Sequence, residues 1–137
     1  PVTVRVINTV FPFANIVVTQ KVTGQALLDV LEGGLGLYPE TSGGFPQVGG
    51  MTVTFDPAKD AGGRITEVLI GEEPLDPEAE YLLATNDFLA AGGDNYAALA
   101  EFPVDMYMGT MDELIVNYLK EHSPVSPEVE GRLVVVE

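Results

Sequence analysis

The chain has 137 residues, of which 46% are hydrophobic and 20% charged, and it has no cysteine. This composition predicts one folded domain over residues 1–137 and excludes disulfides, thiolate chemistry and a disordered chain. Asp and Glu outnumber Lys and Arg by 21 to 6, for a net charge of −15. Such a field repels polyanions, which excludes nucleic acid as a main partner. No run of about 18 apolar residues occurs, so no membrane segment is expected.

The first half of the chain alternates between apolar runs and glycine-rich turns. It begins at Pro1 without an initiator Met or a signal segment, so we expect a processed product or a piece of a longer protein. Residues 2–10 fit both strand alternation and helical spacing, and this choice stays open. The pattern then predicts a strand over 16–22 and a helix over 25–32 that Thr23 caps and the pair Gly33-Gly34 ends.

A long loop follows, because residues 33–50 hold seven of the 15 glycines. A loop of that length without regular structure is usually functional or mobile. Later segments predict a strand over 51–55, a turn over 56–63, a strand over 64–70 that completes an antiparallel hairpin, a turn over 71–77 and a buried strand over 81–85.

Thr110 and Glu113 form a capping-box pattern before the apolar run 114–119. This pattern predicts a helix of about three turns. A proline-rich break follows, and residues 132–136 predict a closing strand. The order strand, helix, hairpin, strand, helix and strand indicates an α+β fold.

The residue inventory offers no catalytic machinery or metal site. The only histidine, His122, lies in the last turn of the second predicted helix, where the helix dipole explains it without a ligand role. Asp56 and Asp60 lack the further carboxylates of a calcium loop and fit a solvated hairpin turn. No Ser-His or Cys-His pair and no phosphate-binding GK[ST] loop is present. We therefore expect no cofactor in this chain.

A group of candidate ligand-binding residues remains. Phe45 lies in the glycine-rich loop and Phe88 at the exit of a strand, where an exposed ring can stack on a planar ligand. Asp94 follows Gly92 and Gly93, which permit positive φ and close ligand approach, and its carboxylate can accept hydrogen bonds from sugar hydroxyls. On pattern alone, Phe88 also fits a core residue and Asp94 a carboxylate that stabilises a turn.

Taken in order, these segments resemble the C-terminal domain of the 5'-nucleotidase and UDP-sugar hydrolase family, from about Phe11 to Val136. The segments that carry the resemblance are Pro12-Phe13-Ala14-Asn15, Thr23-Gly24 with Leu27 to Glu32, Gly43-Gly44-Phe45-Pro46-Gln47-Val48-Gly49-Gly50, Phe55-Asp56-Pro57, Gly63-Arg64-Ile65, Leu75-Asp76-Pro77, Tyr81 and Asn86-Asp87-Phe88-Leu89-Ala90-Ala91-Gly92-Gly93-Asp94.

The resemblance implies an α+β fold of layered mixed and antiparallel sheets flanked by helices. It also implies a division of labour in an extracellular, periplasmic or surface-anchored phosphohydrolase. An N-terminal metallophosphoesterase domain holds two divalent metal ions, and the C-terminal domain grips the nucleoside part of the substrate. This chain resembles the second domain alone, truncated on its N-terminal side, so by itself we expect it to be inactive.

The family's site residues map onto this sequence one at a time. Phe88 matches one ring that sandwiches the base, and Asp94 matches the ribose-binding aspartate of the GGDGY motif, here Gly92 to Tyr96 with Asn95 in place of the last glycine. Asn tolerates the left-handed conformation, which favours the same loop shape. Phe45 is the candidate for the other ring, and Val48 occupies the alternative position. The upstream GGIR-type segment has no counterpart here.

Two alternatives stay open. The same fold can serve as a non-catalytic acidic extracellular interaction module with an idle pocket. The resemblance equally allows a UDP-sugar hydrolase, a cyclic-nucleotide phosphodiesterase or a hydrolase of sulfur conjugates.

Overall fold

Two β-sheets and four α-helices make up the described part of the chain, residues 1–136 of a computed structural model, and Glu137, the last residue of the predicted domain, lies outside it. In chain order the elements are α1 (Val4–Val10), β1 (Ile16–Thr23), α2 (Gly24–Leu35), β2 (Met51–Phe55), β3 (Ile65–Ile70), β4 (Glu73–Pro74), β5 (Glu80–Asn86), α3 (Asp87–Ala90), the 3₁₀ turns η1 (Gly93–Asn95) and η2 (Ala97–Glu101), β6 (Val104–Thr110), α4 (Met111–His122) and β7 (Leu133–Val135).

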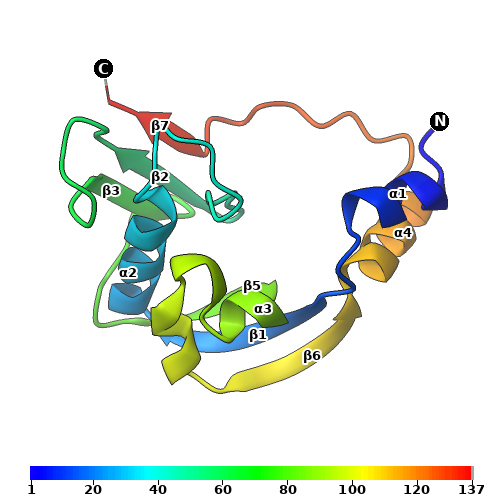
Figure 1. Cartoon of the computed structure of the whole chain (residues 1–137), viewed down its shortest axis with the longest axis horizontal. Helices are drawn as coiled ribbons and strands as arrows, with labels where there is room; N and C mark the ends of the chain where they lie inside the picture. The colour runs from blue at the N-terminus through cyan, green and yellow to red at the C-terminus, as the bar shows by residue number, and fades with distance from the viewer. Residues whose placement is uncertain (137) are drawn as a thin grey trace.

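The strands form one antiparallel and one mixed sheet. The first has the order β5-β1-β6, and the second has the order β4-β3-β2-β7, in which β7 runs parallel to β2. The predicted hairpin is present as β2 and β3, with Val53 opposite Val68. Figure 1 shows the two sheets at different levels, with α2 and α3 near one another and α1 beside α4 at the far side. The α+β prediction of mixed and antiparallel sheets flanked by helices is confirmed.

Helix α2 belongs to both hydrophobic cores. We call these the first core cluster (Val22, Ala26, Leu27, Val30, Tyr96 and Leu99) and the second core cluster (Leu31, Leu35, Val53, Phe55 and Val68). The N-terminal half of α2 contributes to the first cluster, above the β5-β1-β6 sheet, and its C-terminal half contributes to the second, against the β2–β3 hairpin. The predicted cap is correct, because the Thr23 hydroxyl accepts a hydrogen bond from the Ala26 N–H at 3.2 Å.

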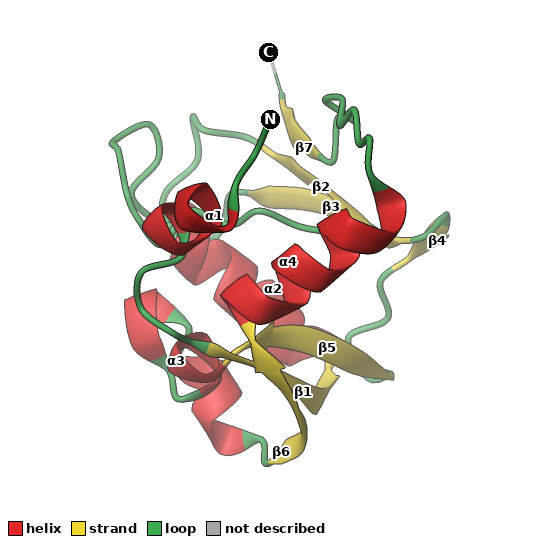
Figure 2. Ribbon diagram, turned by 90° about the vertical axis from the view of Figure 1, so that its right-hand side faces the viewer, coloured by secondary structure: helices red, strands yellow, loops and turns green. Residues whose placement is uncertain are grey.

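Residues 2–10, whose pattern fitted either a strand or a helix, contain the helix α1. Thr3 caps α1, and Ile7 is its buried residue. The helix packs against α4 (Figure 2), which explains why the later, helical spacing of this segment prevails over the initial alternation.

The pair Gly33-Gly34 does not end α2, which continues to Leu35. The two glycines serve another purpose. A Cβ on Gly33 would collide with the Asn95 carbonyl, and one on Gly34 would lie 2.8 Å from the Tyr96 hydroxyl oxygen. Both glycines therefore let the η1 segment lie directly against the helix, a gain that offsets their poor helix propensity.

The strand predicted over 81–85 exists as β5, but it is not buried. It is an edge strand of the first sheet with alternating exposure, and its Leu82 is 66% exposed. A continuous apolar run indicates burial on both faces only when the strand is central in its sheet. The order of segments along the chain does not reveal that β5 lies at the edge. The sequence patterns did not predict β6, the other edge strand, or the short elements α3, η1 and η2.

The second predicted helix is confirmed as α4, but its capping box does not form. Thr110 occupies the N-cap position without a side-chain hydrogen bond to the helix backbone. The Thr110 side chain near Asp112 lowers the pKa of that carboxyl. The closing strand is present as β7.

Arg64 fastens the hairpin to the C-terminal end of α2. Its Nη1 donates to the carbonyls of Leu35 at 2.6 Å, Gly36 at 3.2 Å and Tyr38 at 2.9 Å. In return, the Glu32 carboxylate on α2 accepts from the backbone N–H groups of residues 64 and 65 at 3.1 and 2.7 Å. A cation at this end also opposes the negative pole of the helix dipole.

We predict that Arg64→Met lowers the free energy of unfolding by about 2–3 kcal/mol, because it keeps the apolar stem but leaves three carbonyls without their charged donor. Urea unfolding measures this loss. Arg5→Met removes an exposed cation from α1 and serves as the control. An equal, small loss in both variants would contradict the role given to Arg64.

Candidate functional site

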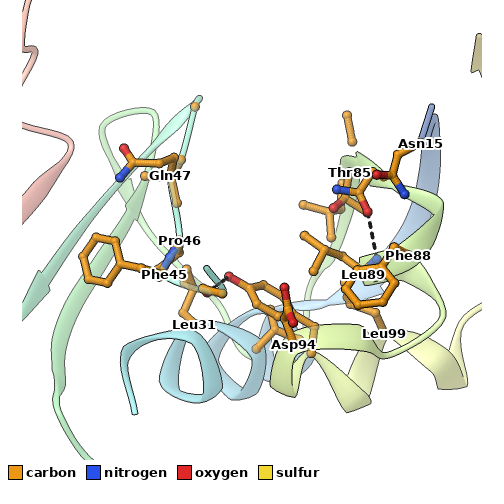
Figure 3. A pocket seen from close by; sticks show the side chains of 18 of the residues that line it. Asn15, Leu31, Phe45, Pro46, Gln47, Thr85, Phe88, Leu89, Asp94 and Leu99 are labelled. Carbon is orange, nitrogen blue, oxygen red and sulfur yellow. Dashed lines mark hydrogen bonds between the residues drawn. The ribbon is translucent and has the colours of Figure 1, made fainter. Parts of the chain in front are cut away.

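A cavity of about 910 Å³ lies between the glycine-rich loop and the end of β5. Its floor includes Leu27, Val30 and Leu31 of α2. In Figure 3, one wall carries Phe45, Pro46 and Gln47, the other carries Asn15, Thr85 and Phe88, and Asp94 lies low between them. The cavity is therefore built on the helix that joins the two cores, with walls from segments that are distant in the sequence.

Among the described residues that line the cavity, Asp94 alone has a charged side chain. The other polar groups are amides, hydroxyls and backbone groups, and most of the lining is apolar. Arg64 bonds carbonyls at the end of α2, and Arg132 bonds the carbonyl of Val48, a residue of the cavity wall, but neither arginine side chain lines the cavity. The site therefore suits a largely apolar, planar ligand with hydroxyl or amide partners rather than a free anion.

The segment that carries Asp94 is held in an unusual backbone conformation. Gly92, Asp94 and Asn95 have φ of 91°, 53° and 70°, all in the left-handed region. For Asp94 and Asn95 such angles cost energy, and residues of this kind gather at functional sites. The exposed Asp94 carboxylate makes no side-chain hydrogen bond within residues 1–136, so it remains available to a ligand and does not stabilise the turn.

Tyr96 ties this segment to the glycine-rich loop. Its ring belongs to the first core cluster, and its hydroxyl donates to the Gly44 carbonyl at 3.0 Å. Burial, and secondly the negative charge of Asp94, raise the pKa of Tyr96, which keeps the hydroxyl protonated as a donor. A Cβ on Gly44 would lie 3.1 Å from both the Cβ and the carbonyl oxygen of Asp94. The η1 segment and the glycine-rich loop are therefore in direct contact low in the cavity (Figure 3).

Phe88 presents an aromatic surface to the cavity. It is 51% exposed, which excludes the interpretation of this residue as part of the core. Its ring lies against Gly93, where an added Cβ would come within 2.5 Å of the ring carbons. The helical turn that carries it is capped by Asn86, whose Oδ1 accepts from the Leu89 N–H at 2.9 Å. The absence of a side chain at Gly93 thus leaves room for the Phe88 ring. Gly92 adopts the left-handed backbone conformation of the turn.

Phe45 also lines the cavity, but its ring is placed differently. The ring packs beside Tyr38 with centroids 6.1 Å apart, at the margin of the second core cluster. In Figure 3 it points away from Phe88, beyond Pro46. The two predicted rings therefore lie on opposite walls, and they do not face one another in this conformation. Val48, the alternative position, lines the same wall.

Asp87 organises the wall of Phe88. Its carboxylate accepts from Asn15 Nδ2 at 3.1 Å, from the Ile16 N–H at 3.1 Å and from the Phe88 N–H at 3.0 Å. The bond from Asn15 contributes most to a lowered pKa of Asp87, burial opposes it, and bonds from the backbone N–H groups of residues 16, 87 and 88 lower the pKa further. Asp87 therefore stays ionised and fixes the start of β1 to the start of α3.

Sequence reasoning missed Asn15, Asn86 and Tyr96 as parts of the site. A signal for Asn86 was present, because Asn directly before Asp and an apolar turn is a helix N-cap pattern. The signal for Tyr96 was its place in the GGDGY-like motif. No local pattern predicted that Asn15 lies beside Asp87, since this contact joins residues 72 positions apart.

The described residues contain no group of three or more His, Cys, Asp or Glu side chains that could hold a metal ion. Their helices include none that is both long and apolar enough to cross a membrane.

Comparison with known proteins places these features in one family. The family described as "5'-nucleotidase, C-terminal domain" matches residues 1–101. The trifunctional nucleotide phosphoesterase protein YfkN of Bacillus subtilis is 35% identical over 140 residues, which cover 96% of this chain and 10% of that protein. Protein UshA of Escherichia coli is 34% identical over 119 residues, 86% of this chain and 20% of UshA.

A solved structure agrees with the sequence relatives. The 5'-nucleotidase precursor from Thermus thermophilus superposes with a TM-score of 0.93 at 35% identity, over 99% of this chain and 28% of that one. The chain thus spans between a tenth and about three tenths of the length of these relatives.

We predict that Gly93→Ala displaces the Phe88 ring, because the new methyl group would overlap the ring carbons and the half-exposed ring can move more easily than the backbone. Aromatic ¹H–¹³C spectra measure this as a shift of the Phe88 resonances. Gly43→Ala is the matched control, since a Cβ there meets no atom within 4 Å. Unchanged Phe88 resonances in Gly93→Ala would show that the ring does not depend on this glycine.

Proposed function

Because the chain belongs to the 5'-nucleotidase C-terminal domain family, we propose that residues 1–137 form the substrate-binding domain of a two-domain phosphohydrolase and bind the nucleoside part of its substrate. The observation that carries the proposal is the arrangement of one exposed ring, Phe88, and one unengaged carboxylate, Asp94, on an apolar cavity.

In the proposed complex the base stacks on Phe88 from the side opposite Gly93. Phe45 turns away from Tyr38 and covers the other face of the base. Base stacking on an aromatic ring contributes about 1–3 kcal/mol per base. Pro46 and the α2 floor exclude water from the remaining surface of the base, which adds apolar burial to the stacking.

Asp94 accepts hydrogen bonds from the two ribose hydroxyls. An ionised carboxylate has acceptor sites for both hydroxyls, and hydrogen bonds to a charged group contribute about 1.5–3 kcal/mol. Gly92 and Gly93 hold the backbone in the turn that directs this carboxylate to the cavity.

The phosphate and the reaction belong to another part of the protein. No cation lines the cavity in the described residues, so nothing here neutralises a phosphate. We propose that an N-terminal metallophosphoesterase domain binds the two divalent metal ions and the attacking water and carries out the hydrolysis. We also propose that the whole protein lies outside the cytoplasm. This chain then contributes position: it holds the nucleoside so that the phosphate ester meets the metals.

The stacking role predicts that Phe88→Ala weakens binding of adenosine to the full-length protein by about 5- to 150-fold, the range that corresponds to loss of one stacked base. Isothermal titration calorimetry measures the dissociation constant. Tyr107→Ala removes a similarly exposed ring, 67% exposed on β6 and outside the cavity, and should leave affinity unchanged. Equal affinity of Phe88→Ala and wild type would reject the stacking role.

The ribose role is tested with a ligand that lacks both hydroxyls. We expect Asp94→Ala to weaken adenosine by more than about tenfold, since charge-assisted hydrogen bonds are lost. It should not affect 2',3'-dideoxyadenosine, which offers no hydroxyl to Asp94. A variant that weakens both ligands equally would show that Asp94 supports the loop and does not contact the sugar.

A further inference from the structure

Two asparagine side chains lie on the wall of Phe88, and the function proposed above gives neither of them a contact with the ligand. Asn86 is the last residue of β5, and Asn15 directly precedes β1. Asn86 pairs with Val17, two residues after Asn15, so alternation along the chain favours the same side of the sheet for both side chains. Both line the cavity, and Figure 3 shows Asn15 above Phe88. A base stacked on Phe88 therefore directs an edge towards them.

The Asn15 amide has a fixed orientation. Its Nδ2 group donates to the Asp87 carboxylate at 3.1 Å, and an ionised carboxylate can only accept. The amide cannot flip, because its oxygen would then face that carboxylate. Within the described residues no hydrogen bond uses Asn15 Oδ1. Asn15 therefore offers an oriented acceptor.

The Asn86 amide is fixed in the opposite sense. Its Oδ1 caps α3 by accepting from the Leu89 N–H at 2.9 Å, and only the oxygen can do this. Within residues 1–136 the Nδ2 group has no partner. Asn86 therefore offers oriented N–H donors on the same wall.

We infer that Asn15 and Asn86 read the edge of the base and favour adenine; this inference rests on the proposed function. The N6 amino group of adenine donates to Asn15 Oδ1, and an adjacent ring nitrogen accepts from Asn86 Nδ2. Adenine has a donor beside an acceptor on either edge of its amino group, whereas guanine offers two acceptors, N7 and O6, on one of its edges. A donor and an acceptor from the protein therefore match adenine in more orientations.

The pair is preorganised, which favours selectivity. Each amide is held at one end by a charged group or by the backbone, so binding fixes few additional rotamers. A site built to hydrogen-bond an amino group also discriminates against an analogue without it, because the protein group is then left without a partner.

The first test uses adenosine and purine riboside, which differ only in the N6 amino group, with the full-length protein. We expect wild type to bind adenosine about 5- to 10-fold more tightly, the effect of one hydrogen bond. Asn15→Ala should abolish this preference, because adenosine alone loses the bond to Oδ1, whereas any effect through Asp87 on the wall of Phe88 weakens both ligands equally. A merely structural role of Asn15 would leave the preference unchanged.

The second test is Asn86→Asp, which keeps the helix cap, because Asp caps as well as Asn, but replaces the donor by an acceptor. We expect an unchanged melting temperature and about tenfold weaker binding of both ligands, since both retain the ring nitrogens. Asn117→Asp adds the same charge on exposed α4, outside the cavity, and should leave both affinities unchanged.

The outcomes separate the inference from the proposed function. Equal affinity of wild type for adenosine and purine riboside, equal weakening of both by Asn15→Ala, or unaltered binding by Asn86→Asp would overturn the inference. In each case, loss of adenosine binding in Phe88→Ala would leave the proposed function in place. Failure of wild type to bind either ligand would overturn both.

Discussion

The division of α2 between two hydrophobic clusters is the constraint on which the site depends. Ala26, Leu27 and Val30 pack over the first sheet, and Leu31 and Leu35 pack against the hairpin. Because one rigid helix serves both, the distance between the sheets is fixed by its length. The cavity is the space that remains above the middle of this helix, which explains why Leu27 and Leu31 belong to a core and to the cavity floor at once.

The close contacts between loops follow from the same helix. Glycines at 33 and 34 let η1 and Tyr96 approach its backbone, and Tyr96 in turn holds the Gly44 carbonyl. A larger residue at either helical position would push the Asp94 turn outward. The two glycines lower the intrinsic stability of the helix, but the packing that they allow offsets this cost, because tertiary packing supplies most of the stability of a buried helix. Arg64 completes the arrangement by holding the carbonyls at the helix end where the glycine-rich loop begins.

Elements with strong local signals could be predicted from the sequence: the Thr23-capped helix, the β2–β3 hairpin and the helix after Thr110. Errors arose where distant contacts decide. Local propensity predicts a helix end at Gly33-Gly34, while the reason for both glycines lies about 60 residues away in Asn95 and Tyr96. For the site, motif order predicted that Phe88 and Asp94 reach one cavity. It could not predict the Phe45 ring beside Tyr38 or the bond from Asn15 to Asp87, which depend on tertiary packing.

Charge gives the last constraint on function. A chain with a net charge of −15 repels a nucleotide, and the carboxylate of Asp94 adds to this at the cavity itself. At physiological ionic strength, screening over about 8 Å limits the long-range part of this repulsion, but it does not neutralise a phosphate placed inside the cavity. In the proposed function, favourable binding must therefore come from stacking, apolar burial and hydrogen bonds to the uncharged nucleoside. In the proposed function, the cations that hold the phosphate lie on the other domain. The negative charge that excludes a phosphate from this cavity then orients the substrate. The nucleoside end binds to this domain, and the phosphate end binds to the metal ions of the other domain.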